Sequence, residues 1–252
     1  MRKTKESFWK RAGIGQLAIP LTALTLLLLF NLIRDPGFFQ IVVNINNSGN
    51  PVLGGNLISV INSASELAII AMGMTLVTAA TGGQDISVGA VGAISASVFI
   101  KVLIGMGDVT GETLIVATLA CIGTAIVFMM FNGTLVSVFK IQPMIATLIL
   151  YSCGRSIAYW ITGSATPQVD SPIITAIGMT IPGIPIPTPV FMVILVGLIL
   201  ALIFKITNTT LYTQSVGINQ GAARLNGINP TGVKMLAFGI LGLCVADRKS
   251  VV

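Results

Sequence analysis

Residues 57–104 have the sequence LISVINSASELAIIAMGMTLVTAATGGQDISVGAVGAISASVFIKVLI, and this stretch decides the fold class. Two long apolar runs, Leu57–Ala80 and Ile86–Ile104, are separated by five residues. A helix rises about 1.5 Å per residue, so about 20 mostly apolar residues cross the hydrocarbon core of a bilayer. The stretch therefore predicts two membrane-spanning helices with a tight, glycine-containing connection.

Further apolar runs of this kind lie on both sides of the pair. They are Leu17–Ile33, Leu114–Phe139, Ile141–Ile161, Val190–Phe204 and the shorter Val233–Ala246. The chain is 54% hydrophobic and 9% charged, whereas soluble domains are about 25% charged. We predict an all-α polytopic membrane protein with about seven transmembrane helices over residues 17–246, the last one incomplete.

The basic residues predict the orientation of the chain. Five of the 14 precede the first apolar run, namely Arg2, Lys3, Lys5, Lys10 and Arg11. If the N-terminus is cytoplasmic, the segments facing that side carry nine basic residues and the opposite side two, leaving aside Arg155 within a span and the last few residues. This asymmetry agrees with the positive-inside rule. We therefore expect residues 1–16 to be cytoplasmic and the net charge of +6 to orient the protein in the membrane. A nucleic-acid partner is not expected.

The composition excludes several kinds of chemistry. Histidine is absent, which removes imidazole from any acid–base or zinc scheme. Cys121, Cys153 and Cys244 lie in apolar runs without CxxC spacing, so we interpret them as small buried packing residues with no role in disulfides or metal binding. No GxxxxGK[ST] phosphate loop is present, so ATP-driven transport would need a partner ATPase. We expect no catalytic residue, metal or cofactor in the chain itself.

Two connections and the tail are predicted to lie outside the bundle. Residues 34–56 are rich in Asn and Gly, and residues 162–189 hold six of the 11 prolines, so both are expected to be non-helical lids. The last six residues, DRKSVV, can be encoded by the start of a common sequencing adapter. We hypothesise that residues 247–252 are a non-native tail.

The connection between the first two quoted runs is the first candidate functional feature. Gly82 and Gly83 leave backbone groups that lipid cannot satisfy, so the break must face protein or water. Asp85 is placed to cap the following helix by accepting a hydrogen bond from the N–H of Ser87 or Val88; contact with a permeating polar solute is the alternative. Small residues follow at helical spacing and favour close helix packing. They are Gly89, Gly92, Ala93, Ala96 and Ser97.

Two charged residues lie within predicted spans, where an ionised group costs at least about 2.5–3.5 kcal/mol. Glu66 is ten residues into its span and is a candidate for the pore or for an interhelical contact. Arg155 is six residues from the outer end of its span, so it can either face the pore or extend its side chain to the interface.

The segment 205–232 contains the sequence VGINQGAARLNGINP. Asn219 can cap a two-turn helix, Gly227 can end it, and Pro230 prevents its resumption. Gly221, Ala222 and Ala223 would form a small exposed face that suits docking into a groove of another protein. An ordinary loop helix is the alternative.

Two stretches in this pattern resemble permease subunits of bacterial ABC importers for monosaccharides, the ribose, xylose and galactofuranose group. They are ATGGQDISVGAVGAI after the second span and VGINQGAARLNGI after the sixth, and KIQPMIATLILYSCGRSIAYWITG is similar to the span between them. The galactofuranose-type permeases are the most similar. Gln84 and Thr209-Thr210-Leu211 depart from the usual pattern, and roughly the last quarter of such a permease is not present.

The resemblance implies a larger permease bundle in the bacterial cytoplasmic membrane. Its implied partners are an ATP-binding subunit that binds the ATP, an extracytoplasmic sugar-binding protein and a second permease copy or homologue. The resemblance also implies that the break at Gly82 to Gly89 lies near the translocation path. Together with the two charged residues named above, the translocation-path candidates are Glu66, Gly82, Gly83, Asp85, Ser87, Gly89 and Arg155. The implied ATPase-coupling helix comprises Gly217, Asn219, Gly221, Ala222, Ala223, Arg224 and Gly227. An ABC permease for another polar solute, such as a branched-chain amino acid, and a polytopic protein without transport activity are the alternatives.

Overall fold

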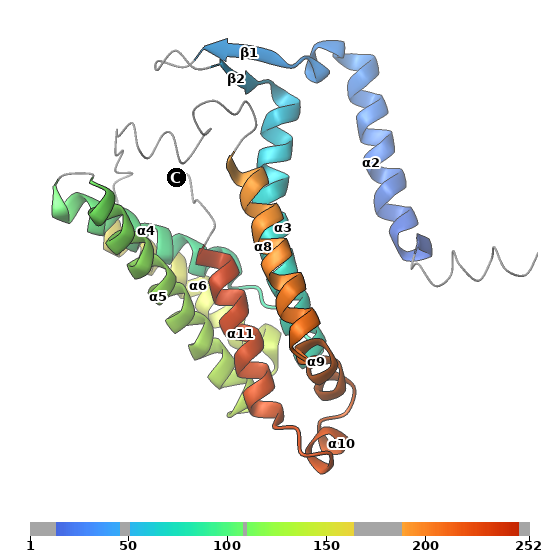
Figure 1. Ribbon diagram of the computed structural model, residues 1–252, viewed down its shortest axis with the longest axis vertical. Coiled ribbons are helices and arrows are strands. Elements are labelled where there is room, and N and C mark those ends of the chain that lie inside the picture. The colour runs from blue at the N-terminus through green and yellow to red at the C-terminus, as the bar shows by residue number, and fades with distance from the viewer. Residues whose placement is uncertain (1–13, 46–50, 108–109, 164–187, 247–252) are drawn as a thin grey trace, which may run out of the picture. The chain divides into compact units, whose positions relative to one another are not determined.

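The computed structural model describes residues 14–45, 51–107, 110–163 and 188–246, and its chain divides into two units, residues 1–61 and 62–252. The predicted basic N-terminus, most of the proline-rich 162–189 connection and the predicted tail lie outside the described residues. Described helices dominate both units (Figure 1). This confirms the all-α prediction.

The first unit contains a helix and a hairpin. Helix α2 (Ile14–Arg34) is followed by the short 3-10 helix η1 (Pro36–Phe39) and by strands β1 (Val42–Ile45) and β2 (Pro51–Gly54). The strands pair antiparallel, with Val42 opposite Gly54. The hairpin is absent from the sequence-based prediction, which expected only a non-helical connection here.

The second unit contains the helices that form the core. They are α3 (Asn56–Thr81, which begins in the first unit), α4 (Val88–Met106), α5 (Gly111–Ser137), α6 (Pro143–Thr162), α8 (Thr188–Ile206), α9 (Thr209–Ile218), α10 (Gln220–Leu225) and α11 (Pro230–Ala246). Each predicted apolar run overlaps one helix, and the ends differ by at most three residues. Helix α9 was not predicted.

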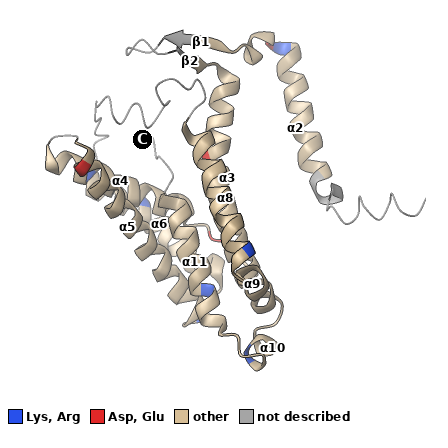
Figure 2. Ribbon diagram, viewed as in Figure 1, with Lys and Arg blue, Asp and Glu red and all other residues tan. Residues whose placement is uncertain are grey.

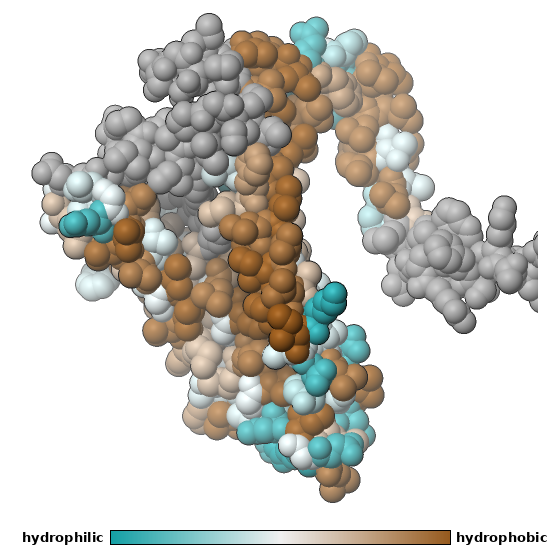
Figure 3. All heavy atoms as spheres, viewed as in Figure 1, coloured by the Kyte–Doolittle hydropathy of each residue, from teal (hydrophilic) through white to brown (hydrophobic). Residues whose placement is uncertain are grey.

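Five described helices, α3, α4, α5, α6 and α8, are long and apolar enough to cross a membrane. Ala18–Arg34 and Pro230–Ala246 are shorter apolar helical stretches. Apolar side chains cover much of the visible surface of α8 (Figure 3), and Leu195, Leu198 and Leu202 are among its exposed residues. An apolar exterior of this kind is expected where lipid is the surrounding solvent.

One core joins five of these helices. It includes Leu76 and Val77 of α3, Val91 of α4, Met129 of α5, Leu150 of α6, and Phe238 and Leu241 of α11. A smaller cluster of Ile69, Leu200 and Cys244 connects α8 to α3 and α11. Because lipid tails are as apolar as these side chains, van der Waals packing is a principal source of helix association here.

Glycines permit the closest helix crossings. A Cβ on Gly154 of α6 would lie 2.8 Å from the Cβ of Ala90 in α4, and one on Gly242 of α11 would lie 3.1 Å from the Cα of Ile126 in α5. These distances are shorter than ordinary van der Waals contacts. The crossings therefore depend on the absence of a side chain.

The cysteine prediction is partly wrong. Cys121 and Cys244 are buried, as expected, but Cys153 is exposed. It lies beside Gly154 on α6, and its side chain lies on the face that no described helix covers. An apolar neighbourhood in the sequence gives no information on which face of a lipid-surrounded helix is covered by protein.

Candidate functional site

The connection between α3 and α4 is a sharp break held by polar contacts. Gly82 has φ +72°, a conformation that glycine adopts without strain. The N–H of Gly83 donates to the hydroxyl oxygen of Thr81 at 3.2 Å. A Cβ on Gly83 would lie 2.9 Å from the Pro143 ring at the start of α6. Gly82 therefore permits the turn, and Gly83 permits the close approach of the connection to α6.

The predicted hydrogen bond to Asp85 is present, but Asp85 is not the N-cap of α4, because the helix begins at Val88 and its N-cap residue is Ser87. Asp85 Oδ1 accepts hydrogen bonds from the N–H and the hydroxyl of Ser87, both at 2.7 Å. The Ser87 oxygen accepts in turn from the Asn132 amide of α5 at 2.7 Å. Asp85 is 2% exposed, and Ser87 and Asn132 are fully buried. The break is thus anchored to α5 through a buried polar network.

Two oxygens of this network have no hydrogen-bond partner among the described residues. They are Asp85 Oδ2 and Asn132 Oδ1. Asp85 lies in the connection, outside the helices α3 and α4. Burial raises the pKa of its carboxyl above the ordinary value, and hydrogen bonding to Ser87 and Asn132 opposes this rise. Buried polar oxygens without partners are expected to bind a proton donor or water.

A second contact fixes the break to α6. The N–H of Ile86 donates to the hydroxyl oxygen of Thr147 at 3.1 Å, while that hydroxyl donates to the carbonyl of Pro143 at 2.9 Å. Sequence reasoning missed both Asn132 and Thr147. The only signal was a polar residue in the middle of an apolar run, and such residues often bond to their own helix.

The other charged candidates do not join this network. Glu66 is half-buried on α3, and Arg155 is exposed on α6. The guanidinium of Arg155 donates to the Tyr151 hydroxyl at 3.4 Å and lies 5.3 Å from the centre of that ring. Within the described part of the chain, no ion pair links Glu66, Asp85 and Arg155.

The predicted small-residue face of α4 is only partly in contact. Gly92, Ala96 and Ser97 are buried, as close packing requires. Gly89 is exposed, and a Cβ there would meet nothing within 4 Å. The expectation of tight packing is therefore wrong at Gly89, because Ala90, one residue on, takes the contact with α6.

The predicted short helix is present as α10. The Asn219 side chain accepts from the N–H of Ala222 at 3.0 Å, which confirms the N-cap. Gly227 has φ +78°, and the N–H of Ile228 donates to the carbonyl of Ala223 at 3.0 Å, a pattern that ends a helix. Pro230 was expected only to prevent the short helix from continuing. It is also the first residue of α11, a helix position that proline favours.

The exposed face of α10 is smaller than predicted. Gly221, Ala222 and Arg224 are exposed, but Ala223 is only 3% exposed. Gly217, near the end of α9, lies against α3, where a Cβ would overlap the backbone oxygen of Ala79. Gly217 therefore positions the α9–α10 segment against the helix that leads to the break.

The two ends of the second unit differ in charge (Figure 2). One end carries the break, the α5–α6 connection and α10, and its described basic residues are Lys140, Lys205, Arg224 and Lys234. The other end carries Lys101 and Glu112. No group of three acidic or cysteine side chains that could hold a metal ion occurs among the described residues.

Comparison with known proteins places this arrangement in context. Residues 56–246 match a family described as "Branched-chain amino acid transport system / permease component". The galactofuranose transporter permease protein YtfT of Escherichia coli K12 is 37% identical over 226 residues, which cover 90% of this chain and 63% of the relative.

Other curated relatives are similar over comparable ranges. The fructose import permease protein FruF of Bifidobacterium longum is 31% identical over 95% of this chain and 66% of its own length. The ribose import permease protein RbsC of E. coli K12 is 29% identical over 75% of this chain and 58% of its own length. The chain thus spans about two thirds or less of the length of these relatives. No solved structure gives a significant match.

Proposed function

The chain belongs to the family of branched-chain amino acid transport system permease components, and on this basis we propose that it is the permease subunit of an ATP-driven importer for a monosaccharide. The observation that carries the proposal is the similarity to permeases named for galactofuranose, fructose and ribose over 75–95% of the chain. Galactofuranose is the first solute to test, because the permease named for it is 37% identical.

In the proposed mechanism, the permease makes and breaks no covalent bond. A partner ATPase binds and hydrolyses ATP below the membrane, and a binding protein delivers the sugar above it. A second permease copy or homologue completes the pathway. The permease would switch between an outward-facing and an inward-facing state, and this switch would move the sugar across the membrane. The sugar can shift the balance between the two states only if it binds them with different free energies.

The contacts described above support roles for two segments. The break at residues 82–87 is held by Asn132 and Thr147, so movement of α5 or α6 would be transmitted to it directly. We propose that this break lines the translocation path together with Glu66. Arg155 is exposed on α6 and would face the path only if a partner subunit covers that face.

The α10 helix is the proposed coupling helix. Its exposed residues Gly221 and Ala222 offer a small surface for docking, and Gly217 holds the preceding helix against α3. Force applied to α10 by an ATPase would therefore reach the helix that leads to the break. The basic residues at this end support a cytoplasmic orientation for it. We propose that the N-terminus is cytoplasmic as well, because five basic residues precede the first apolar run.

Uptake of labelled galactofuranose, ribose and fructose tests the proposal in cells that express the chain with its neighbouring ATPase and binding-protein genes. We expect uptake of one of these sugars that depends on the ATPase. In the Gly221→Arg variant, uptake should be lost and the ATPase should no longer co-purify with the chain. Gly111→Arg is the matched control, because Gly111 is exposed at the opposite end of the unit, and this variant should keep the ATPase bound.

Other outcomes would redirect the proposal. Uptake of leucine or valine with no uptake of any sugar would favour the amino-acid alternative that the family description names. Retention of the ATPase by a correctly inserted Gly221→Arg variant would remove the coupling role from α10.

A further inference from the structure

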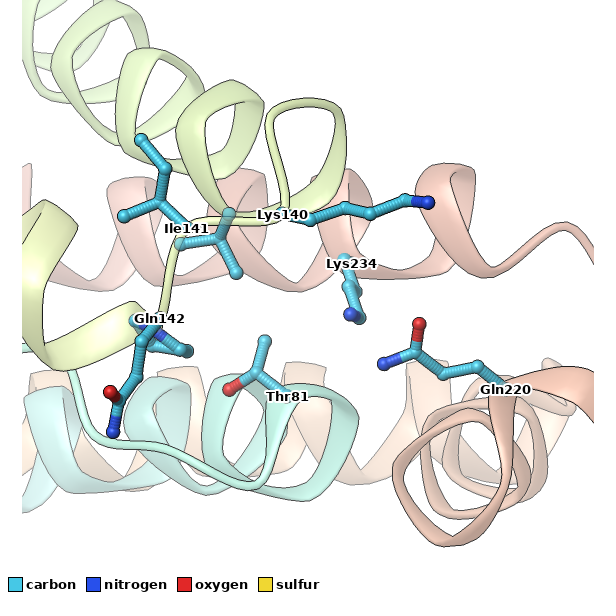
Figure 4. Close-up of a pocket in the computed structure, with 8 residues that line it drawn as sticks. Thr81, Lys140, Ile141, Gln142, Gln220 and Lys234 are labelled. Carbon is cyan, nitrogen blue, oxygen red and sulfur yellow. The ribbon is translucent and has the colours of Figure 1, made fainter.

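A cavity of about 200 Å³ lies at the end of the second unit that carries α10 (Figure 4). Its polar lining comes from four separate places in the chain: Thr81 at the end of α3, Lys140 and Gln142 in the α5–α6 connection, Gln220 at the start of α10, and Lys234 in α11. None of the residues proposed for the sugar path lines it.

Lys234 dominates the chemistry of this cavity. The residue is only 8% exposed, and its ammonium points into the space between Thr81 and Gln220 (Figure 4). Among the described residues, the ammonium has neither a carboxylate partner nor a hydrogen-bond acceptor. The ammonium opens onto the cavity and has no anionic partner there, so the site favours any group that supplies negative charge.

The other polar side chains are suited to the same kind of ligand. The amides of Gln142 and Gln220 make no hydrogen bond with a described residue and are free to donate. The Thr81 hydroxyl is already occupied, because it donates to the carbonyl of Val77 at 2.7 Å and accepts from Gly83. The cavity thus presents amide N–H donors, together with the amide oxygens, beside the Lys234 ammonium.

Lys140 adds a second positive charge at a strained position. Its φ is +55°, and it is the only described residue other than glycine with positive φ. Such a conformation is unfavourable for a residue with a side chain. The one described carboxylate near this end, Asp85, is committed to the buried network with Ser87. No described acidic side chain therefore compensates the two lysines.

We propose that this cavity is a binding site for a phosphate group, with Lys234 as its central ligand and Gln220 and Lys140 as supporting donors. Lysine binds phosphate as a point charge, and basic pockets between transmembrane helices on the cytoplasmic side bind anionic lipid headgroups. The phosphate can therefore come from an anionic lipid or from the aqueous phase. The proposal does not depend on which solute the permease transports.

The full chain, purified in detergent, provides the test. Thermal unfolding is measured with inorganic phosphate or chloride at equal ionic strength, and with added phosphatidylglycerol or phosphatidylcholine. Ligand at about ten times its dissociation constant should raise the midpoint by about 2–6 °C. Lys234→Met should abolish this rise. Lys205→Met is the matched control, since Lys205 is an exposed lysine on α8 outside the cavity.

Each outcome decides the proposal. A rise with inorganic phosphate that Lys234→Met removes supports a site for free phosphate, and a rise with phosphatidylglycerol alone that the same variant removes supports a headgroup site. No rise with either ligand, or an equal rise in Lys234→Met, would overturn the proposal. If Lys234→Met does not fold, Gln220→Leu replaces it, because Gln220 is exposed on α10, and it should weaken binding ~10-fold.

Discussion

Gly217 in α9 lies so close to Ala79 in α3 that a Cβ on residue 217 would overlap the Ala79 backbone oxygen. The two residues are separated by more than half of the chain, yet no side chain fits between their backbones. This contact fixes α9, and through it α10, against the helix that ends at the glycine-rich break. It is the most direct physical link between the two proposed functional segments.

Gly217→Ala should therefore destabilise the protein by about 1–3 kcal/mol, because a methyl group would force α9 away from α3. The measurement is the free energy of unfolding in detergent, together with uptake. Gly123→Ala is the control, since a Cβ on Gly123 in α5 meets nothing within 4 Å. An equal effect of the two substitutions would contradict the close contact.

Asp85→Ala should lower the free energy of unfolding by about 1–3 kcal/mol, because it leaves the buried N–H and hydroxyl of Ser87 without their acceptor. Asp35→Ala is the matched control. Asp35 accepts from the Gly37 N–H at 3.0 Å in the same type of turn, but at an exposed position, so its loss should cost less than about 1 kcal/mol. Similar losses at both sites would show that the burial of Asp85 has no energetic weight.

Asp85→Asn should change the pH dependence of stability. Burial raises the pKa of the Asp85 carboxyl in the folded chain above 3.8, so the folded state binds the proton more tightly than the unfolded state. Stability from this group is present below the ordinary pKa and is lost as the pH rises through the folded-state pKa. Unfolding measured from about pH 4 to 7 should show this loss in the native chain but not in the variant. Parallel pH profiles would argue against the shift.

Gly154→Ala should separate α6 from α4, because the new methyl would lie 2.8 Å from the Ala90 Cβ. We expect a loss of about 1–3 kcal/mol in the free energy of unfolding. Cys153→Ala changes the adjacent but exposed residue and should alter stability by less than about 0.5 kcal/mol. The reverse order of effects would mean that the opposite face of α6 makes the contact.

Asn219→Ala should remove the N-cap of α10 at a cost of about 1 kcal/mol. Because α10 has six residues, this loss should fray the helix and reduce uptake without reducing membrane insertion. Asn219→Ser keeps a capping oxygen and should restore uptake. If Asn219→Ala transports as well as the native chain, the α10 conformation is not needed for coupling.

The extents of the helices were largely determined by the sequence. Apolar runs such as Leu57–Ala80 and Ile141–Ile161 predicted α3 and α6 to within two residues, because a bilayer-spanning segment must satisfy its own backbone hydrogen bonds. The Asp85–Ser87 hydrogen bond and the N-cap at Asn219 were also predictable, since both are local contacts between residues two or three apart. The α9 helix and the hairpin were missed because neither has a long apolar run.

Contacts between distant segments required the tertiary structure. Nothing in the sequence pairs Asn132 with Ser87, Thr147 with Ile86, or Gly217 with Ala79, because each pairing depends on which helix faces are in contact. In a membrane protein both the lipid-facing and the buried faces are apolar, so hydrophobic periodicity does not distinguish them. The sequence by itself thus determined the long apolar helices and the local hydrogen bonds of Asp85 and Asn219. The buried polar network, the exposure of Cys153 and the cavity around Lys234 were decided by helix packing alone.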